Sequence, residues 1–170
     1  MTTLFYLASA VAVLSTLMVI TRTNAVHALL YLVISLLSVA LIFFMLGAPF
    51  VAALEVIVYA GAIMVLFVFV VMLLNVGPQS AETESRLFRP RMLVGPVILA
   101  AILLTELIVA LGPVAEPAAV QKVSPQAVGV ALFGTYLLGV ELAGFLLLAG
   151  LVGAFHLGYR ARGAGEEDSR

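Results

Sequence analysis

The sequence predicts an all-α integral membrane protein with five transmembrane helices. Of its 170 residues, 64% are hydrophobic and only 10% are charged, which is too little polar surface to cover the core of a soluble domain. Apolar runs of about 18 residues or more are typical of helices that span a bilayer, and such runs make up most of the chain. The chain has no cysteine, which excludes disulfides and thiolate-held iron–sulfur clusters on it.

Five apolar segments are the predicted spans. They run over about 3–21, 25–47, 50–75, 92–112 and 136–158, each close to the ~20 residues that a ~30 Å hydrocarbon core requires. Between the first two spans, Asn24 is a residue type that caps helices. The "GAP" at 47–49 predicts a very tight turn between the second and third spans.

The last part of the chain predicts more than one helix. Ser124 and Pro125 are typical of an N-cap and a first helical residue. The distance from there to the end of the last apolar run is too long for one straight span. We therefore expect an interfacial helix over about 125–133, a break near Gly134, and a polar tail over 159–170. The chain as a whole, 1–170, is expected to form a single membrane domain.

The basic residues predict the orientation in the membrane. With five spans, Lys122 falls on one side, and seven arginines fall on the other: Arg22, Arg86, Arg89, Arg91, Arg160, Arg162 and Arg170. Since basic residues concentrate in the cytoplasm, the N-terminus is expected to be periplasmic and the C-terminus cytoplasmic. This pattern indicates a multi-pass membrane protein.

Three glutamates, Glu55, Glu106 and Glu141, lie inside predicted spans. An ionised carboxylate in hydrocarbon costs several kcal/mol, so each is a candidate functional residue. All three fall roughly 7–9 Å inside the outer boundary at 1.5 Å per residue. Glu55 and Glu141 lie in first helical turns, where the helix dipole alone favours a negative charge. Glu106 lies near a helix C-terminus and is expected to need a partner or a proton, unless it faces water at a thinned rim.

Tyr59 follows Glu55 by four residues, so both lie on one helix face. It lies about 15 Å along the helix from Pro49, near the bilayer midplane. Tyrosine prefers the interface, and at the midplane its hydroxyl needs a hydrogen-bond partner. It is either a packed residue bonded to a backbone carbonyl or a link in a chain of water and carboxylates.

Small residues recur in the third and last spans. Ala60, Gly61 and Ala62 predict either a close helix–helix contact or a local π-bulge, and the pattern alone favours the contact. The last span carries small residues four apart: Gly139/Ala143, Ala149/Gly153 and Gly150/Ala154. Such a helix is suited to packing by partners, which indicates a subunit of a larger complex.

Histidines offer one further possibility. His27 and His156 both fall near the predicted cytoplasmic side, and two histidines on separate helices could ligate a haem. Interfacial hydrogen bonding is the simpler interpretation. No other pattern indicates a metal site or a nucleic-acid partner.

Two segments resemble a known family. "LEVIVYAGAIMVLFVFVVMLLN", at 54–75, resembles the third-helix signature of subunit J of bacterial proton-pumping NADH:quinone oxidoreductase, respiratory complex I. "ALFGTYLLGVELAGFLLLAGLVGAFH", at 131–156, is similar to the last helix of the same family, whose mitochondrial counterpart is NADH dehydrogenase chain 6. The resemblance covers nearly the whole chain.

The resemblance implies a membrane-arm subunit of a proton-translocating NADH:quinone oxidoreductase, located in the bacterial cell inner membrane. Such a chain performs no redox catalysis and holds no cofactor or metal, because FMN, iron–sulfur clusters, NADH and quinone belong to other subunits. Its expected partners are subunits K and H, an antiporter-like subunit, and lipid. It would contribute to a hydrated proton path and to the coupling of quinone reduction to proton translocation.

The resemblance also implies roles for individual residues. Tyr59, Glu55 and Glu141 match acids and the tyrosine of the family motifs and would belong to the proton path. Glu106, the remaining proton-path candidate, falls outside both motifs. A π-bulge is implied around 59–65, and it would let the helix rotate and gate the path through Ala60, Gly61, Ala62, Ile63, Met64 and Val65.

Two other classes of function stay open on the sequence. The chain could be a purely structural scaffold subunit, or it could be a small independent transporter or haem-bearing membrane anchor. No internal repeat is visible, so an inverted-repeat transporter is not supported.

Overall fold

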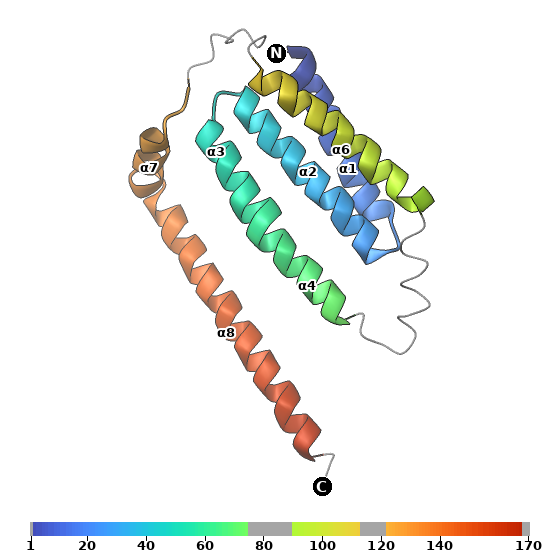
Figure 1. The fold of residues 1–170 in the computed structure, drawn as a ribbon. Helices are drawn as coiled ribbons and strands as arrows, with labels where there is room; N and C mark the ends of the chain where they lie inside the picture. The colour runs from blue at the N-terminus through green and yellow to red at the C-terminus, as the bar shows by residue number, and fades with distance from the viewer. Residues whose placement is uncertain (1, 75–89, 113–121, 168–170) are drawn as a thin grey trace. The chain divides into compact units, whose positions relative to one another are not determined.

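The computed structural model describes residues 2–74, 90–112 and 122–167, without the side chains of 74, 90–92 and 159–167. These residues form α-helices and one π-helix, with no strand among them (Figure 1). In chain order the elements are α1 (Thr2–Thr21), α2 (Ala25–Met45), α3 (Pro49–Leu54), the π-helix η1 (Glu55–Ile63), α4 (Met64–Leu74), α6 (Pro90–Leu111), α7 (Pro125–Phe133) and α8 (Leu137–Glu167).

Five helical segments are long and apolar enough to cross a membrane, which confirms the predicted fold class. They are Thr2–Thr21, Ala25–Met45, Pro49–Leu73, Leu93–Leu111 and Leu137–Gly158. The third segment is one continuous rod made of α3, η1 and α4.

The chain divides into two compact units, Met1–Val123 and Ser124–Arg170. The first unit holds α1 to α6 and the second holds α7 and α8. The single membrane domain expected from the sequence stays a prediction.

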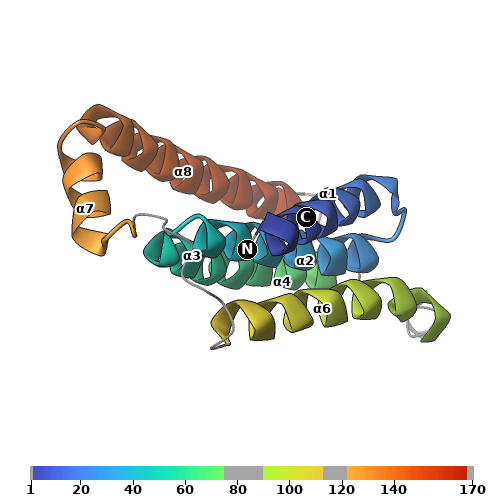
Figure 2. The ribbon, with the colours of Figure 1, turned by 90° about the horizontal axis from the view of Figure 1, so that it is seen from above.

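Helix α2 is the centre of the first unit. It packs against α1, against α6 and against the rod of α3, η1 and α4, while α6 also packs against α1 (Figures 1 and 2). The buried core joins Ala8 of α1, Leu41 of α2, and Leu103 and Ala110 of α6. Because two of these four side chains are only methyl groups, the helix backbones can approach closely.

Polar contacts fix α1 against α2. The Thr16 and Ser35 hydroxyl oxygens lie 2.8 Å apart and share a hydrogen bond across the interface. The Arg22 guanidinium lies 5.5 Å from the centre of the Tyr31 ring, within the range of a cation–π contact. The first contact satisfies two hydroxyl groups within the spans, where lipid could not, whereas Arg22 lies in the exposed connection between the two helices.

The helix ends follow local sequence signals. Asn24 caps α2, because its side-chain oxygen accepts hydrogen bonds from the Val26 and His27 N–H groups at 3.0 and 3.3 Å. After α2 the backbone turns at Gly47, whose φ of 82° favours glycine. The Val123 N–H donates to the Gly47 carbonyl at 2.8 Å, which holds this turn.

The second unit begins with a capped short helix. The Ser124 hydroxyl accepts a hydrogen bond from the Ala127 N–H at 3.2 Å, and α7 ends at Gly134. Helix α8 then runs through the apolar span and continues to Glu167. The polar segment expected as a tail from residue 159 is therefore helical to Glu167.

Candidate functional site

The candidate site is the π-helix η1, which occupies nine residues in the middle of the third span. At its end the Met64 N–H donates to the Tyr59 carbonyl, five residues back, and to the Gly61 carbonyl. Spacing of five residues distinguishes a π-helix from an α-helix. The predicted π-bulge of the third helix is thus present.

The π-helix lies a few residues earlier in the chain than the sequence predicts. The sequence predicts the bulge around 59–65, whereas η1 covers Glu55–Ile63. Met64 and Val65 therefore belong to α4. Met64 is 2% exposed and Val65 is 65% exposed, so Met64 anchors the start of α4 and Val65 faces away from the unit.

Gly61 explains part of the local geometry. A Cβ atom added there would lie 3.2 Å from the Val56 carbonyl oxygen, which is tight, and would meet nothing else within 4 Å outside the adjacent turns and the undescribed residues. Within the first unit, no atom of another described helix lies within 4 Å of such a Cβ, so the close helix–helix contact favoured by the pattern is not seen inside this unit. The missing side chain instead relieves crowding within the π-helix itself.

Glu55 and Tyr59 lie on this π-helix, but their surroundings differ. Glu55 is half-buried and Tyr59 is 50% exposed. Within the described residues no residue of η1 is buried, and no hydrogen bond joins Glu55 to Tyr59. The polar face of η1 is therefore open to whatever covers the unit in the assembled protein.

An apolar cavity of about 550 Å³ borders η1. Val56 of η1 lines it together with residues of α2, α3 and α6, including Phe44, Ala53 and Leu107. Space beside a helix lowers the steric barrier to its rotation, since close packing otherwise resists such movement.

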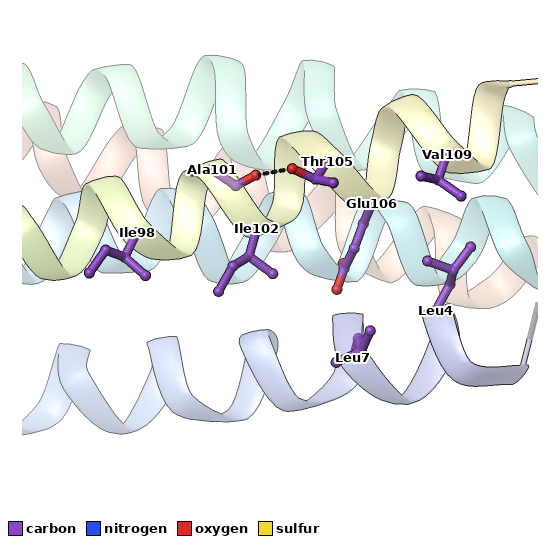
Figure 3. A pocket seen from close by; sticks show the side chains of 8 residues that line it. All are labelled: Leu4, Leu7, Ile98, Ala101, Ile102, Thr105, Glu106 and Val109. Carbon is purple, nitrogen blue, oxygen red and sulfur yellow. Dashed lines mark hydrogen bonds between the residues drawn. The ribbon is translucent and has the colours of Figure 1, made fainter.

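Glu106 lies elsewhere in the first unit. It is 3% exposed, and neither carboxylate oxygen has a hydrogen-bond partner among the described residues. It lines a second cavity, between α6 and α1, with Leu4 and Leu7 (Figure 3). The structure thus joins Glu55 and Tyr59 on one helix and directs Glu106 to a different interface.

Glu141 belongs to the second unit, in the second turn of α8, and is exposed within that unit. Neither its expected place in the proton path nor that of the other site residues is tested by the fold.

Two further polar groups are buried without a partner among the described residues, and sequence reasoning singled out His27 but missed Ser15. His27 has both ring nitrogens unpartnered, and the Ser15 hydroxyl is also unpartnered, among the described residues. Ser15 follows Ala8 and Val11 on the face of α1 that is buried. This seven-residue spacing was the available signal that Ser15 faces the interior. His156 is exposed on α8.

Sequence comparisons place the chain among known proteins. Residues 15–157 match the family described as NADH-ubiquinone/plastoquinone oxidoreductase chain 6. The NADH-quinone oxidoreductase subunit J of Pseudomonas aeruginosa is 59% identical over 156 residues, which cover 91% of this chain and 94% of that protein. The subunit J of Escherichia coli K12 is 56% identical over 163 residues, 95% of this chain and 88% of that protein. The subunit J of Rhodobacter capsulatus is 38% identical over 164 residues, 93% and 81% respectively.

Fold and site together define a multi-pass helical membrane protein whose third span contains a π-helix. It is a membrane-arm subunit of NADH:quinone oxidoreductase, respiratory complex I, in the bacterial inner membrane. The chain belongs to the NADH-ubiquinone/plastoquinone oxidoreductase chain 6 family. It is therefore part of an oxidoreductase complex, and other subunits of that complex are its partners.

Proposed function

We propose that this chain helps to couple quinone reduction to proton translocation, with η1 as the element that opens and closes a hydrated proton path. The observation that carries the proposal is a nine-residue π-helix in mid-span that bears both Glu55 and Tyr59. A π-helical segment inside an α-helix often marks a functional site.

The flanks of η1 are anchored and its middle is not. Ala52 in α3 and Met64 in α4 are both buried, whereas no residue of η1 is buried among the described residues. A change from π to α spacing would rotate the segment by one residue, about 100°, with a rise of about 1.5 Å. Such a rotation would carry Tyr59 into or out of a path for water, and the helix on one side of η1 would turn with it.

Glu55 and Tyr59 would act on protons in this path. A carboxyl group can take up and release a proton, and a tyrosine hydroxyl can both donate and accept a hydrogen bond. Together they would hold water beside the helix in one of its two forms. Glu141 would contribute a further carboxyl group from α8.

The redox chemistry would belong to other subunits. The chain lacks cysteine and so cannot supply thiolates to an iron–sulfur cluster. We propose that FMN, the clusters, NADH and quinone are all bound elsewhere in the complex. The exposed apolar face of η1 and α4, which includes Ile57 and Val65, would contact subunits K and H, an antiporter-like subunit and lipid.

The proposal is tested by Val65→Gly and Tyr59→Phe in the complete complex. Val65→Gly loosens the helix just after η1, because glycine lowers helix stability by about 1 kcal/mol. Tyr59→Phe removes only the hydroxyl. We expect both variants to assemble and oxidise NADH while translocating fewer protons per electron in sealed vesicles. Normal pumping by both variants would contradict the gating role.

A scaffold role is the second candidate. It is favoured by α8, where a Cβ added at Gly139, Gly150 or Gly153 would meet no described atom within 4 Å outside the backbone of its own helical turns. These positions suit close packing by a partner helix. A scaffold would show the opposite result, since its variants would fail to assemble but would pump normally once assembled.

A further inference from the structure

Glu106 is a buried carboxyl group outside both family motifs, on the face of α6 that packs against α1. The residue is 3% exposed, and both of its oxygens lack a hydrogen-bond partner among the described residues. Its side chain leaves α6 in the direction of α1, toward Leu7 (Figure 3). A polar group in this position needs a chemical explanation.

The groups beside Glu106 give it no hydrogen bond. The neighbouring Thr105 hydroxyl already donates to the Ala101 carbonyl at 2.8 Å (Figure 3). The other residues that line the cavity are aliphatic: Leu4, Leu7, Ile98, Ala101, Ile102 and Val109.

Charged and titratable groups on the packed helices lie elsewhere. Helix α1 has no charged residue, and its titratable Tyr6 is 67% exposed. On α2, His27 and Tyr31 belong to the first two turns, at the end near the start of α6. Arg91 lies in the first turn of α6, about 22 Å along the helix from Glu106.

These surroundings determine the state of the carboxyl group. An ionised carboxylate without donors or a positive partner is strongly disfavoured in an apolar environment. The protonated form carries its own O–H donor and no charge. While its oxygens are covered and no positive partner is near, the protonated form of Glu106 is therefore favoured over the ionised form.

Space for exchange lies next to it. The cavity that Glu106 lines has a volume of about 440 Å³ and opens at the surface of the first unit. It is large enough for water, and the Glu106 carboxyl group and the Thr105 hydroxyl are the polar groups that could bind water there. A change of side-chain rotamer would bring the carboxyl group into this space. On release, the carboxyl O–H bond breaks and the proton passes to water, leaving a hydrated carboxylate; uptake is the reverse.

We propose that Glu106 is a proton-binding site at the α1–α6 interface, which holds its proton while covered and exchanges it with water in the adjacent cavity. The inference rests on the proposed proton path, to which it would add a second site. Proton exchange at Glu106 does not require η1 to move. Leu103 and Leu107 of α6 line the cavity beside η1, whereas Glu106 lines the separate cavity between α6 and α1.

The test uses the complete complex in native membranes. Dicyclohexylcarbodiimide adds to protonated carboxyl groups in apolar surroundings, and mass spectrometry locates the adduct. Glu106→Gln removes the exchangeable proton but keeps the shape, and Glu106→Asp keeps the carboxyl group. Glu116→Gln is the matched control, because it makes the same change outside the predicted helices, between the span 92–112 and the interfacial helix 125–133.

We expect the peptide with Glu106 to be labelled in the unmodified complex. We also expect Glu106→Gln to lower the number of protons translocated per electron at least two-fold, while Glu106→Asp and Glu116→Gln do not. An unlabelled Glu106, or normal pumping by Glu106→Gln, overturns the proposal. The proposal is also overturned if Glu106→Gln fails to assemble while Glu106→Asp assembles normally. The carboxylate would then pair with a cation of a partner subunit. Loss of pumping in Tyr59→Phe with normal pumping in Glu106→Gln would reject this site alone.

Discussion

Gly61→Ala is the smallest change that separates a moving π-helix from a fixed one. The added methyl group would lie 3.2 Å from the Val56 carbonyl oxygen in the π-helical form. That oxygen belongs to the backbone and cannot turn aside as a side chain can. In an α-helix, alanine is favoured over glycine by about 1 kcal/mol.

The two effects shift the balance in the same direction. Alanine stabilises the α-helical form relative to glycine, but in the π-helical form the close contact with the Val56 carbonyl oxygen cancels part of this stabilisation. The ratio of π to α forms therefore falls by up to about five-fold, which corresponds to about 1 kcal/mol. Gly61→Val adds a β-branched side chain and is expected to have a larger effect.

The assay is the ratio of protons translocated to electrons transferred in sealed vesicles, with assembly checked on native gels. Gly129→Ala in α7 is the matched control, since a Cβ there meets no described atom within 4 Å outside the backbone of its own helical turns. We expect Gly61→Ala to assemble and to lower the ratio, with Gly61→Val lower still. If both Gly61 variants assemble fully and match the unmodified complex, the reasoning about η1 is refuted.

Two further predictions concern packing in the first unit. Gly95→Ala would place a methyl group against the Tyr31 hydroxyl, so we expect less assembled complex on native gels. Tyr31→Phe removes that hydroxyl and should restore assembly in the double variant; failure to do so would mean that another contact is responsible. Met64→Ala opens a cavity at a side chain that is 2% exposed, and we expect a loss of roughly 2 kcal/mol or more. Thermal dissociation of the purified complex measures this loss, and an unchanged midpoint would contradict the anchoring role.

The membrane fold follows directly from the sequence because the bilayer imposes a simple rule. Each span needs about 20 apolar residues with all backbone groups bonded internally, and these runs are visible without any structure. The end of α8 was less predictable. The sequence turns polar after Gly158, but a polar segment can continue a helix, and α8 reaches Glu167.

The candidate site was predictable only in part. Glycine and its small neighbours indicate a weak point in the third helix, but hydropathy does not distinguish five-residue from four-residue hydrogen bonding. For this reason the sequence predicts the start of the π-helix at Tyr59, four residues after its observed start at Glu55. The burial of Glu106 could not be read from its own helix, because it depends on how α6 packs against α1.

Density maps of the assembled complex, at rest and during turnover, test the central claim most directly. The account predicts a π-helix over Glu55–Ile63 in one state and an α-helix in the other, with Tyr59 rotated by about 100°. The same helical form and the same position of Tyr59 in both states would contradict it.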